Sequence, residues 1–340
     1  MKQVVLEQPG RLVASEGVPP GSPGPDEALV RVRSVGVCGT DFHAFKGDQP
    51  FFTYPRILGH ELSAELIEAP NAAGLKTGDR CAVEPYMECG RCVACRRGRT
   101  NCCAKLEVLG IHVDGGMREL IKVPVRKLHR SESLSFEQLA LVETLSIGAH
   151  AVGRAGLESG ETVLVVGTGP IGLAVIQSAQ PLGVQVLATD VNEARLEFCR
   201  RQMGVEHTFP TDASAASAEE ALREATHGDM PTVVFEATGN PASMERSFGF
   251  VASGGKLVLV GLCQSKISFF DPEFHRREMT LLSSRNALAA DFKRVLSAVE
   301  AGTLDTRPWI THRASLADVA AALPSWTDPR AGVLKAMVEV

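Results

Sequence analysis

One stretch of the chain, residues 162–172, limits the possible folds more than any other. Five apolar or β-branched residues (162–166) run directly into glycines spaced as G-x-G-x-x-G, and a helical pattern continues to about residue 179. Such glycines let the backbone approach a pyrophosphate, which then rests on the N-terminus of the helix. We therefore expect contacts to a dinucleotide cofactor from Gly167, Gly169, Pro170, Ile171 and Gly172.

The next strand pattern, residues 185–189, ends at Asp190, 18 residues beyond Gly172. An acidic side chain at this place accepts hydrogen bonds from both hydroxyls of the adenosine ribose and repels a 2′-phosphate. The sequence therefore predicts NAD in preference to NADP, with Arg195 as a further cofactor-binding residue. The alternative role for Asp190 is to cap the helix expected from about residue 193, and one side chain can serve both purposes.

The pattern of the chain changes near residue 147. Before that point, short alternating strands such as residues 30–35 and 80–83 are separated by Gly and Pro, which predicts a small antiparallel barrel. Afterwards strands and helices alternate, as in βαβ units with a parallel sheet. We expect an α/β protein with a catalytic domain of residues 1–147 and 284–340 and a cofactor domain of residues 148–283. Further strands are expected at 231–236, 256–261 and 333–340, and helices at 291–301 and 316–323.

A cysteine cluster in residues 89–103 indicates a structural metal. Three cysteines at three-residue spacing and a fourth can close a tetrahedron of thiolates around zinc, with no open position. Neighbouring arginines (91, 96, 97 and 99) would lower the thiolate pKa values. The expected ligands are Cys89, Cys92, Cys95 and Cys103, with Cys102 competing for the fourth place; Cys81, Cys199 and Cys263 fit inert core thiols.

A second set of metal donors lies earlier in the chain, at Cys38 and at His60-Glu61, 22 residues further on. Each residue has an ordinary alternative, because a lone Cys is usually a small buried hydrophobe and a lone His a satisfied core or surface group. Together, a thiol, an imidazole and a carboxylate are the ligands of a catalytic zinc, which keeps one position open for water or substrate. The sequence thus predicts two zinc ions per subunit with different tasks.

Composition narrows the classes of partner. The chain has 340 residues, a formal net charge of −5 and a pI near 6.0, which argues against a nucleic acid or an anionic membrane. Charge interrupts the first residues too soon for a signal peptide, and no apolar run approaches the ~20 residues of a membrane span. Nine cysteines, five of them between 89 and 103, fit metal ligation in a reducing cytosol. We expect a cytoplasmic protein with a small-molecule substrate.

With these motifs in view, the whole chain resembles the zinc-dependent medium-chain dehydrogenases, most closely the bacterial polyol, sugar-acid and threonine branch. The resemblance is carried by residues 38–43, 59–61, 110–116, 143–146 and 167–172 and by the cysteine cluster. It implies a GroES-like barrel, a Rossmann domain, and dimers or tetramers. It also implies that Cys38 and His60 hold the catalytic zinc, while Glu61 and Glu143 ligate it directly or from close by.

The implied activity is NAD-dependent oxidation of a secondary alcohol in a polyol or sugar acid to the ketone. Zinc would act as a Lewis acid on the hydroxyl, and Thr40 and His43 are a plausible relay for its proton. Thr40 could instead be a simple turn hydroxyl. Threonine dehydrogenase is the alternative activity, since residues 310–313 and 329–332 resemble that type. A relative that binds NAD without turnover is the alternative from another class.

Overall fold

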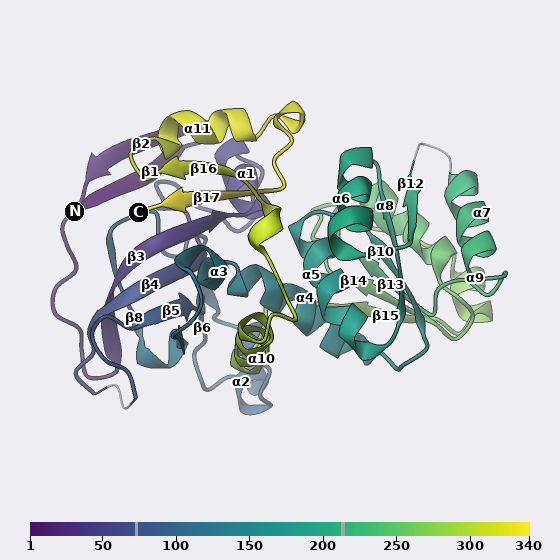
Figure 1. The fold of residues 1–340 in the computed structure, drawn as a ribbon, viewed down its shortest axis with the longest axis horizontal. Helices are drawn as coiled ribbons and strands as arrows, with labels where there is room; N and C mark the ends of the chain where they lie inside the picture. Colours follow the sequence, from purple (N-terminus) through teal and green to yellow (C-terminus); the bar gives the residue numbers. More distant parts are fainter. Residues whose placement is uncertain (72–73, 212–214) are drawn as a thin grey trace. The chain divides into compact units, whose positions relative to one another are not determined.

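The computed structural model describes residues 1–71, 74–211 and 215–340, and the chain forms two compact units. The first unit joins Met1–Glu143 to Leu288–Val340, and the second is Thr144–Ala287. In Figure 1 the first unit carries the purple, blue and yellow parts of the chain, and the second carries the teal and green parts. No helix in the described residues is long and apolar enough to cross a membrane.

A mainly antiparallel sheet forms the centre of the first unit. Within the described residues it has seven strands in the order β16-β17-β3-β4-β5-β9, with β8 also paired to β3, and only β16 and β17 run parallel. The strands are β3 (Glu27–Val37), β4 (Glu61–Glu68), β5 (Arg80–Val83), β8 (Leu120–Pro124), β9 (Leu128–Ser131), β16 (Ile310–Ser315) and β17 (Lys335–Glu339). The expected barrel-like, GroES-type architecture is confirmed.

Alternation of side chains explains how this sheet builds a core. In the first part of β3, Ala28, Val30 and Val32 are fully buried, while Arg31 is exposed, which is the period-two pattern of a half-buried strand. The last strand, β17, pairs antiparallel with β3 and aligns Val338 with Val35, so the two ends of the chain share one core (Figure 1).

Shorter elements surround the sheet of the first unit. Its other strands are β1 (Lys2–Gln8), β2 (Arg11–Glu16), β6 (Tyr86–Met87) and β7 (Glu107–Val108). Its helices are α1 (Gly39–Lys46), α2 (Val93–Arg96), α3 (Phe136–Ala140), α10 (Ala289–Glu300) and α11 (Val319–Trp326). Helix α4 (Val142–Ala155) begins in this unit and continues into the second.

The second unit is a doubly wound parallel sheet, as expected. Its strand order in the described residues is β12-β11-β10-β13-β14-β15, which places the first strand, β10, beside the fourth, β13. This order is that of a Rossmann fold, whose ligands bind where the order reverses. The strands are β10 (Thr162–Val166), β11 (Gln185–Asp190), β12 (His207–Pro210), β13 (Val233–Glu236), β14 (Lys256–Leu259) and β15 (Thr280–Ser283). The helices are α5 (Pro170–Ala179), α6 (Glu193–Met203), α7 (Ala215–Ala225), α8 (Pro241–Ser247) and α9 (Asp271–Arg276).

Several element bounds differ from those expected. Strand β13 begins at Val233, because Pro231 has no N–H to donate to a ladder. The final strand begins at Lys335, and α11 at Val319. Beyond residue 147, three strands were not predicted: β12, β15 and β16. All three lie at the edge of a sheet and are partly exposed, so they show little of the pattern that marks a buried strand.

Candidate active site

Cys38 is placed at the N-terminus of α1. It occupies the N-cap position in an extended conformation, with φ −95° and ψ 158°. The carboxylate of Asp41 accepts a hydrogen bond of 2.9 Å from the Cys38 backbone N–H, which fixes the first turn. The Cys38 side chain therefore lies at the N-terminus of this helix.

His60 and Glu61 follow a tightly packed glycine loop that leads into β4. Gly59 has φ +98°, and residues 110–117 lie directly against it. A Cβ added at Gly115 would stand 2.3 Å from the Gly59 carbonyl oxygen, so only glycine fits there. Gly116 and Met117 donate backbone hydrogen bonds of 3.0 Å to Gly59 and Leu58. The 110–116 motif thus holds the His60 loop in place.

These loops bring Cys38, His60 and Glu61 together, with one ligand atom from each within 4.8 Å of the others. His60 is 5% exposed, and its Nδ1 has no hydrogen-bond partner in the described residues. Burial lowers the pKa of His60, but Asp41, Cys38 and Glu143 outweigh burial and hold that pKa well above its usual range. A buried imidazole beside a thiol and carboxylates fits a divalent cation, which would replace the proton.

Glu143 lies in the first turn of α4 and is 5% exposed, but it is not in the three-residue group. Burial raises the pKa of Glu143 to about 7, and His60 opposes this rise. The hydroxyl of buried Tyr86 donates to Glu143 Oε1. Tyr86 was not predicted as a site residue because it lies in no motif. The only signal is that the hydroxyl of a buried tyrosine requires a hydrogen-bond partner.

Lys335 was also missed. Its ammonium is 1% exposed and lies 2.6 and 2.7 Å from the two oxygens of Glu61, and it donates a third bond to the Val37 carbonyl at 3.2 Å. Burial lowers the pKa of Lys335, but Glu61, Cys38 and Glu143 together outweigh burial and hold that pKa above its usual value. The sequence signal that could have identified Lys335 is its position inside the apolar run of the last strand, because lysine is rarely buried unless it is paired.

The second cysteine set also converges. Ligand atoms of Cys89, Cys92, Cys95 and Cys103 lie within 4.8 Å of one another, whereas Cys102 is exposed and outside the group. Hydrogen bonds from the backbone N–H groups of Cys95 and Ala104 are the main cause that lowers the pKa of Cys92 to about 6. Burial raises the pKa of Cys95 to about 12. The expected lowering of the thiolate pKa values by the arginines is therefore wrong for Cys95, and the lowering at Cys92 comes from the backbone.

The remaining cysteines divide into two kinds. Burial raises the pKa of Cys81 and of Cys199 to about 12, as expected for inert core thiols. Cys263 differs from the expectation, because it is only half-buried and lies in the loop after β14.

Thr40 and His43 lie three residues apart on α1, and Thr40 is half-buried. The His43 ring is 62% exposed, and its Nδ1 is 2.9 Å from the carboxylate of Asp48. Thr40 is thus part of a helix and not a simple turn. Since residues at i and i+3 share a helix face, the positions of Thr40 and His43 are compatible with a proton relay between their side chains.

In the second unit the glycine turn follows β10 and begins α5. Gly167 has φ +90°, and a Cβ on Gly172 would lie 1.9 Å from the Gly167 carbonyl oxygen. Gly169 caps α5, with only Arg195 within 4 Å of where its Cβ would be, and Pro170 and Ile171 form the first turn. This open, glycine-lined helix N-terminus fits a dinucleotide pyrophosphate.

Asp190 ends β11 beside that turn and is 7% exposed. Its carboxylate accepts hydrogen bonds from Thr168 and from the backbone N–H of Asn192, and Arg195 lies 4.0 Å away. The alternative role as a helix cap is wrong. Asn192 caps α6 instead, because its side-chain oxygen accepts from the N–H groups of Ala194 and Arg195.

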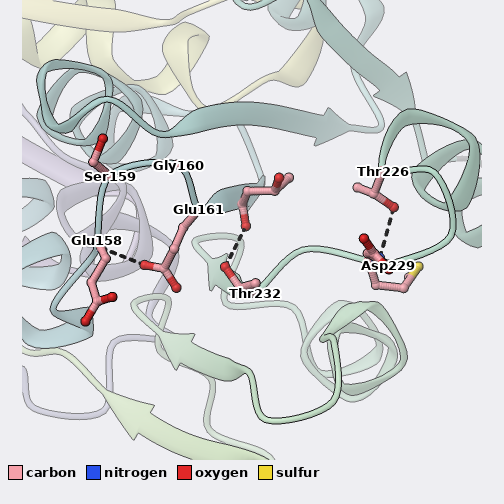
Figure 2. A pocket seen from close by; sticks show the side chains of 9 residues that line it. Glu158, Ser159, Gly160, Glu161, Thr226, Asp229 and Thr232 are labelled. Carbon is pink, nitrogen blue, oxygen red and sulfur yellow. Dashed lines mark hydrogen bonds between the residues drawn. The ribbon is translucent and has the colours of Figure 1, made fainter.

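A separate hollow of about 430 Å³ lies at the other edge of this sheet, near the amino ends of β10 and β13 (Figure 2). It is lined mainly by hydroxyl and carboxylate side chains, among them Glu158, Glu161 and Asp229, which Figure 2 labels. None of its described lining residues is a cysteine or a histidine, and the glycine turn lies at the opposite, carboxyl edge. It is therefore no part of the cofactor site.

Comparison with known proteins identifies the class. Residues 24–133 match the alcohol dehydrogenase GroES-like domain, and residues 170–301 match the zinc-binding dehydrogenase model. The chain belongs to the zinc-dependent medium-chain dehydrogenase family, as the motifs indicated. It is therefore an oxidoreductase of a family that uses zinc and a nicotinamide cofactor.

Among individual relatives, L-galactonate-5-dehydrogenase of Escherichia coli K12 is 41% identical over 321 residues, which cover 94% of this chain and 93% of that protein. Two solved structures superpose over 100% of this chain and 99% of theirs. A zinc-binding dehydrogenase of Sinorhizobium meliloti 1021 bound to NADP is 29% identical with a TM-score of 0.90. A short chain alcohol dehydrogenase (rspB) of E. coli CFT073 complexed with NADH is 27% identical with a TM-score of 0.91.

The Lys335–Glu61 pair gives a first prediction. Lys335→Met should destabilise the protein by about 3–5 kcal/mol, because it leaves the Glu61 carboxylate buried without its cation. Adding Glu61→Met should recover most of this loss. Urea unfolding at matched metal content measures both. A single variant as stable as wild type would show that Glu61 does not depend on Lys335.

Proposed function

We propose that the protein oxidises a secondary alcohol of a sugar acid or polyol to the ketone, with NAD as acceptor and a catalytic zinc. The convergence of Cys38, His60 and Glu61 at a buried site carries this proposal. The proposal is supported by the family of the chain, which combines a GroES-like domain with a zinc-binding dehydrogenase domain. The substrate class rests on the sugar-acid dehydrogenase that is 41% identical.

Cys38, His60, Glu61 and Glu143 would hold the zinc, which supplies a Lewis acid for the substrate hydroxyl. Nicotinamide supplies the hydride acceptor. The chain's own residues set the environment: Lys335 balances the charge of Glu61, and Tyr86 fixes one oxygen of Glu143. Asp41 fixes the turn that carries Cys38.

The substrate proton has to leave this buried site. Thr40 would accept it first and His43 would release it to water, since the His43 ring is exposed and its Nδ1 lies 2.9 Å from the carboxylate of Asp48. Imidazole is the side chain suited to this task near neutral pH.

NAD is proposed over NADP because Asp190 places a carboxylate at the end of β11, where a 2′-phosphate would be repelled. Gly167, Gly169, Pro170, Ile171, Gly172 and Arg195 would complete the cofactor site.

A homo-oligomer, dimer or tetramer, is proposed for the functional state. Strand β15 is an edge of the parallel sheet, and Leu281 on it and nearby Phe270 are 39% and 70% exposed. An exposed apolar edge strand is a template for pairing with a second copy. Sedimentation that yields only the 36.3 kDa monomer would rule this out.

A reducing compartment such as the cytoplasm is proposed because the nine cysteines are all free thiols. Cell fractionation that finds the protein in an oxidising compartment would contradict this location.

The substrate proposal is tested with a panel of sugar acids, polyols and L-threonine, following NADH formation at the absorbance of the reduced cofactor. We expect the highest kcat/KM for a sugar acid or polyol. A clear preference for L-threonine would establish the alternative, threonine dehydrogenase. Binding of NAD without turnover of any class would favour the non-catalytic alternative.

Two zinc ions per chain are proposed, with unlike lability. Mild chelation should abolish activity and leave about one zinc bound, because four thiolates leave no open position for a chelator. Metal analysis by mass spectrometry measures this. Cys38→Ser should fold without activity, whereas Cys92→Ser should lower the yield of folded protein. One zinc in the untreated, fully active protein would contradict the proposal.

His43→Ala tests the proton relay. Losing a general base should slow alcohol oxidation near neutral pH by about 10²–10⁴-fold, with recovery as pH rises and hydroxide takes the proton. Zinc content and NAD affinity should stay unchanged. Replacement of exposed His275 on α9 by Ala is the matched control. Near wild-type turnover of His43→Ala at all pH values would remove His43 from the mechanism.

A further inference from the structure

The carboxylate of Asp190 is already engaged by the protein itself. Its Oδ2 accepts two hydrogen bonds from one residue, the backbone N–H of Thr168 at 2.7 Å and the Thr168 hydroxyl at 2.9 Å. Its Oδ1 accepts the backbone N–H of Asn192 at 2.9 Å. Thr168 is the residue between the first two glycines of the turn, and it is fully buried.

These bonds limit what Asp190 can offer a cofactor. A carboxylate has about four acceptor positions, two on each oxygen. Thr168 occupies both positions of Oδ2 and Asn192 one position of Oδ1, which leaves one position on Oδ1. Asp190 can therefore take one ribose hydroxyl strongly, and not both as the sequence analysis expected. The remaining oxygen position also has a fixed direction, because the carboxylate cannot turn without breaking a bond to Thr168.

We propose that Thr168 is a positioning residue that fixes the Asp190 carboxylate and thereby sets the preference for NAD over NADP. This inference rests on the proposed function, in which Asp190 reads the adenosine ribose. The Thr168 hydroxyl acts through Asp190 and not on the cofactor, since it is buried and directed at the carboxylate.

The physical consequence concerns charge near the ribose. Arg195, 38% exposed, has a guanidinium nitrogen 4.0 Å from Asp190 Oδ2. While Thr168 holds the carboxylate, negative charge stays fixed between Arg195 and the turn, and a 2′-phosphate is repelled. Without the hydroxyl, only the backbone N–H groups of Thr168 and Asn192 hold the carboxylate. The carboxylate is then less firmly fixed, and Arg195 can pair more readily with a phosphate. Losing the hydroxyl should thus weaken NAD binding and relax the discrimination against NADP.

The experiment measures the dissociation constants of NAD and NADP by titration calorimetry on the zinc-loaded protein. Thr168→Val should weaken NAD binding by about tenfold, the size of one hydrogen bond to a charged group, and NADP binding by less. The NAD-to-NADP affinity ratio should therefore fall. Thr168→Ser, which keeps the hydroxyl, should restore both the affinity and the ratio. Thr168→Ala, with a smaller side chain, replaces Thr168→Val if the latter does not fold.

Thr189→Val is the matched control. Thr189 precedes Asp190 on β11 and is equally buried, but its hydroxyl bonds to Phe209 and Thr211 and not to Asp190. This variant loses a buried hydroxyl at the same place and should keep the affinity ratio.

Three results would overturn the inference: an unchanged NAD affinity in Thr168→Val, an equal loss for both cofactors, or a ratio change as large in Thr189→Val. An equal affinity of the wild type for NAD and NADP would overturn it as well. Failure of the proposed function is distinguishable, because the wild type would then bind neither dinucleotide.

Discussion

The buried ion pair between Lys335 and Glu61 is the interaction on which the first unit depends. Glu61 directly follows His60 and opens β4, while Lys335 opens β17, 274 residues later. Strand β17 pairs with β3, and β3 pairs with β4. The Lys335 ammonium therefore links the last strand to the residue next to His60, the imidazole proposed to bind zinc. An unpaired charge at this depth would cost several kcal/mol, so the pairing of Lys335 with Glu61 stabilises both the sheet and the position of Glu61.

In the rest of the candidate site, buried polar groups are likewise held by hydrogen-bond partners. Tyr86 donates to Glu143, Asp41 fixes the Cys38 turn, and the His60 Nδ1 is left without a hydrogen bond in the described structure. That arrangement suits a cation, because buried donors and acceptors without partners are costly unless a ligand completes them. In the second unit, Thr168 restrains Asp190 in a comparable way, so in both units a group proposed to contact a ligand is held by a second residue.

Prediction from sequence succeeded where a pattern is local. The strand, glycine turn and helix at residues 162–179 and the cysteine spacing at 89–103 were found because contacts within some 20 residues determine them. Strands β12, β15 and β16 were missed because they lie at sheet edges and show no clear apolar alternation. The strand predicted from residue 231 begins at Val233 instead, because Pro231 has no N–H to donate to a neighbouring strand.

The sequence by itself determined the family, the two ligand sets and the glycine turn, since spacing and residue chemistry suffice for each. Only the tertiary structure decided the hydrogen-bond partners of those groups. Glu61 is paired with Lys335, and Glu143 accepts from Tyr86. Asp190 accepts from the backbone N–H and the hydroxyl of Thr168. It also chose Cys103 over Cys102 and Asn192 over Asp190 as helix cap. The reason is physical: a buried charge takes whichever partner the fold brings within 3 Å, and sequence distance carries no information about that.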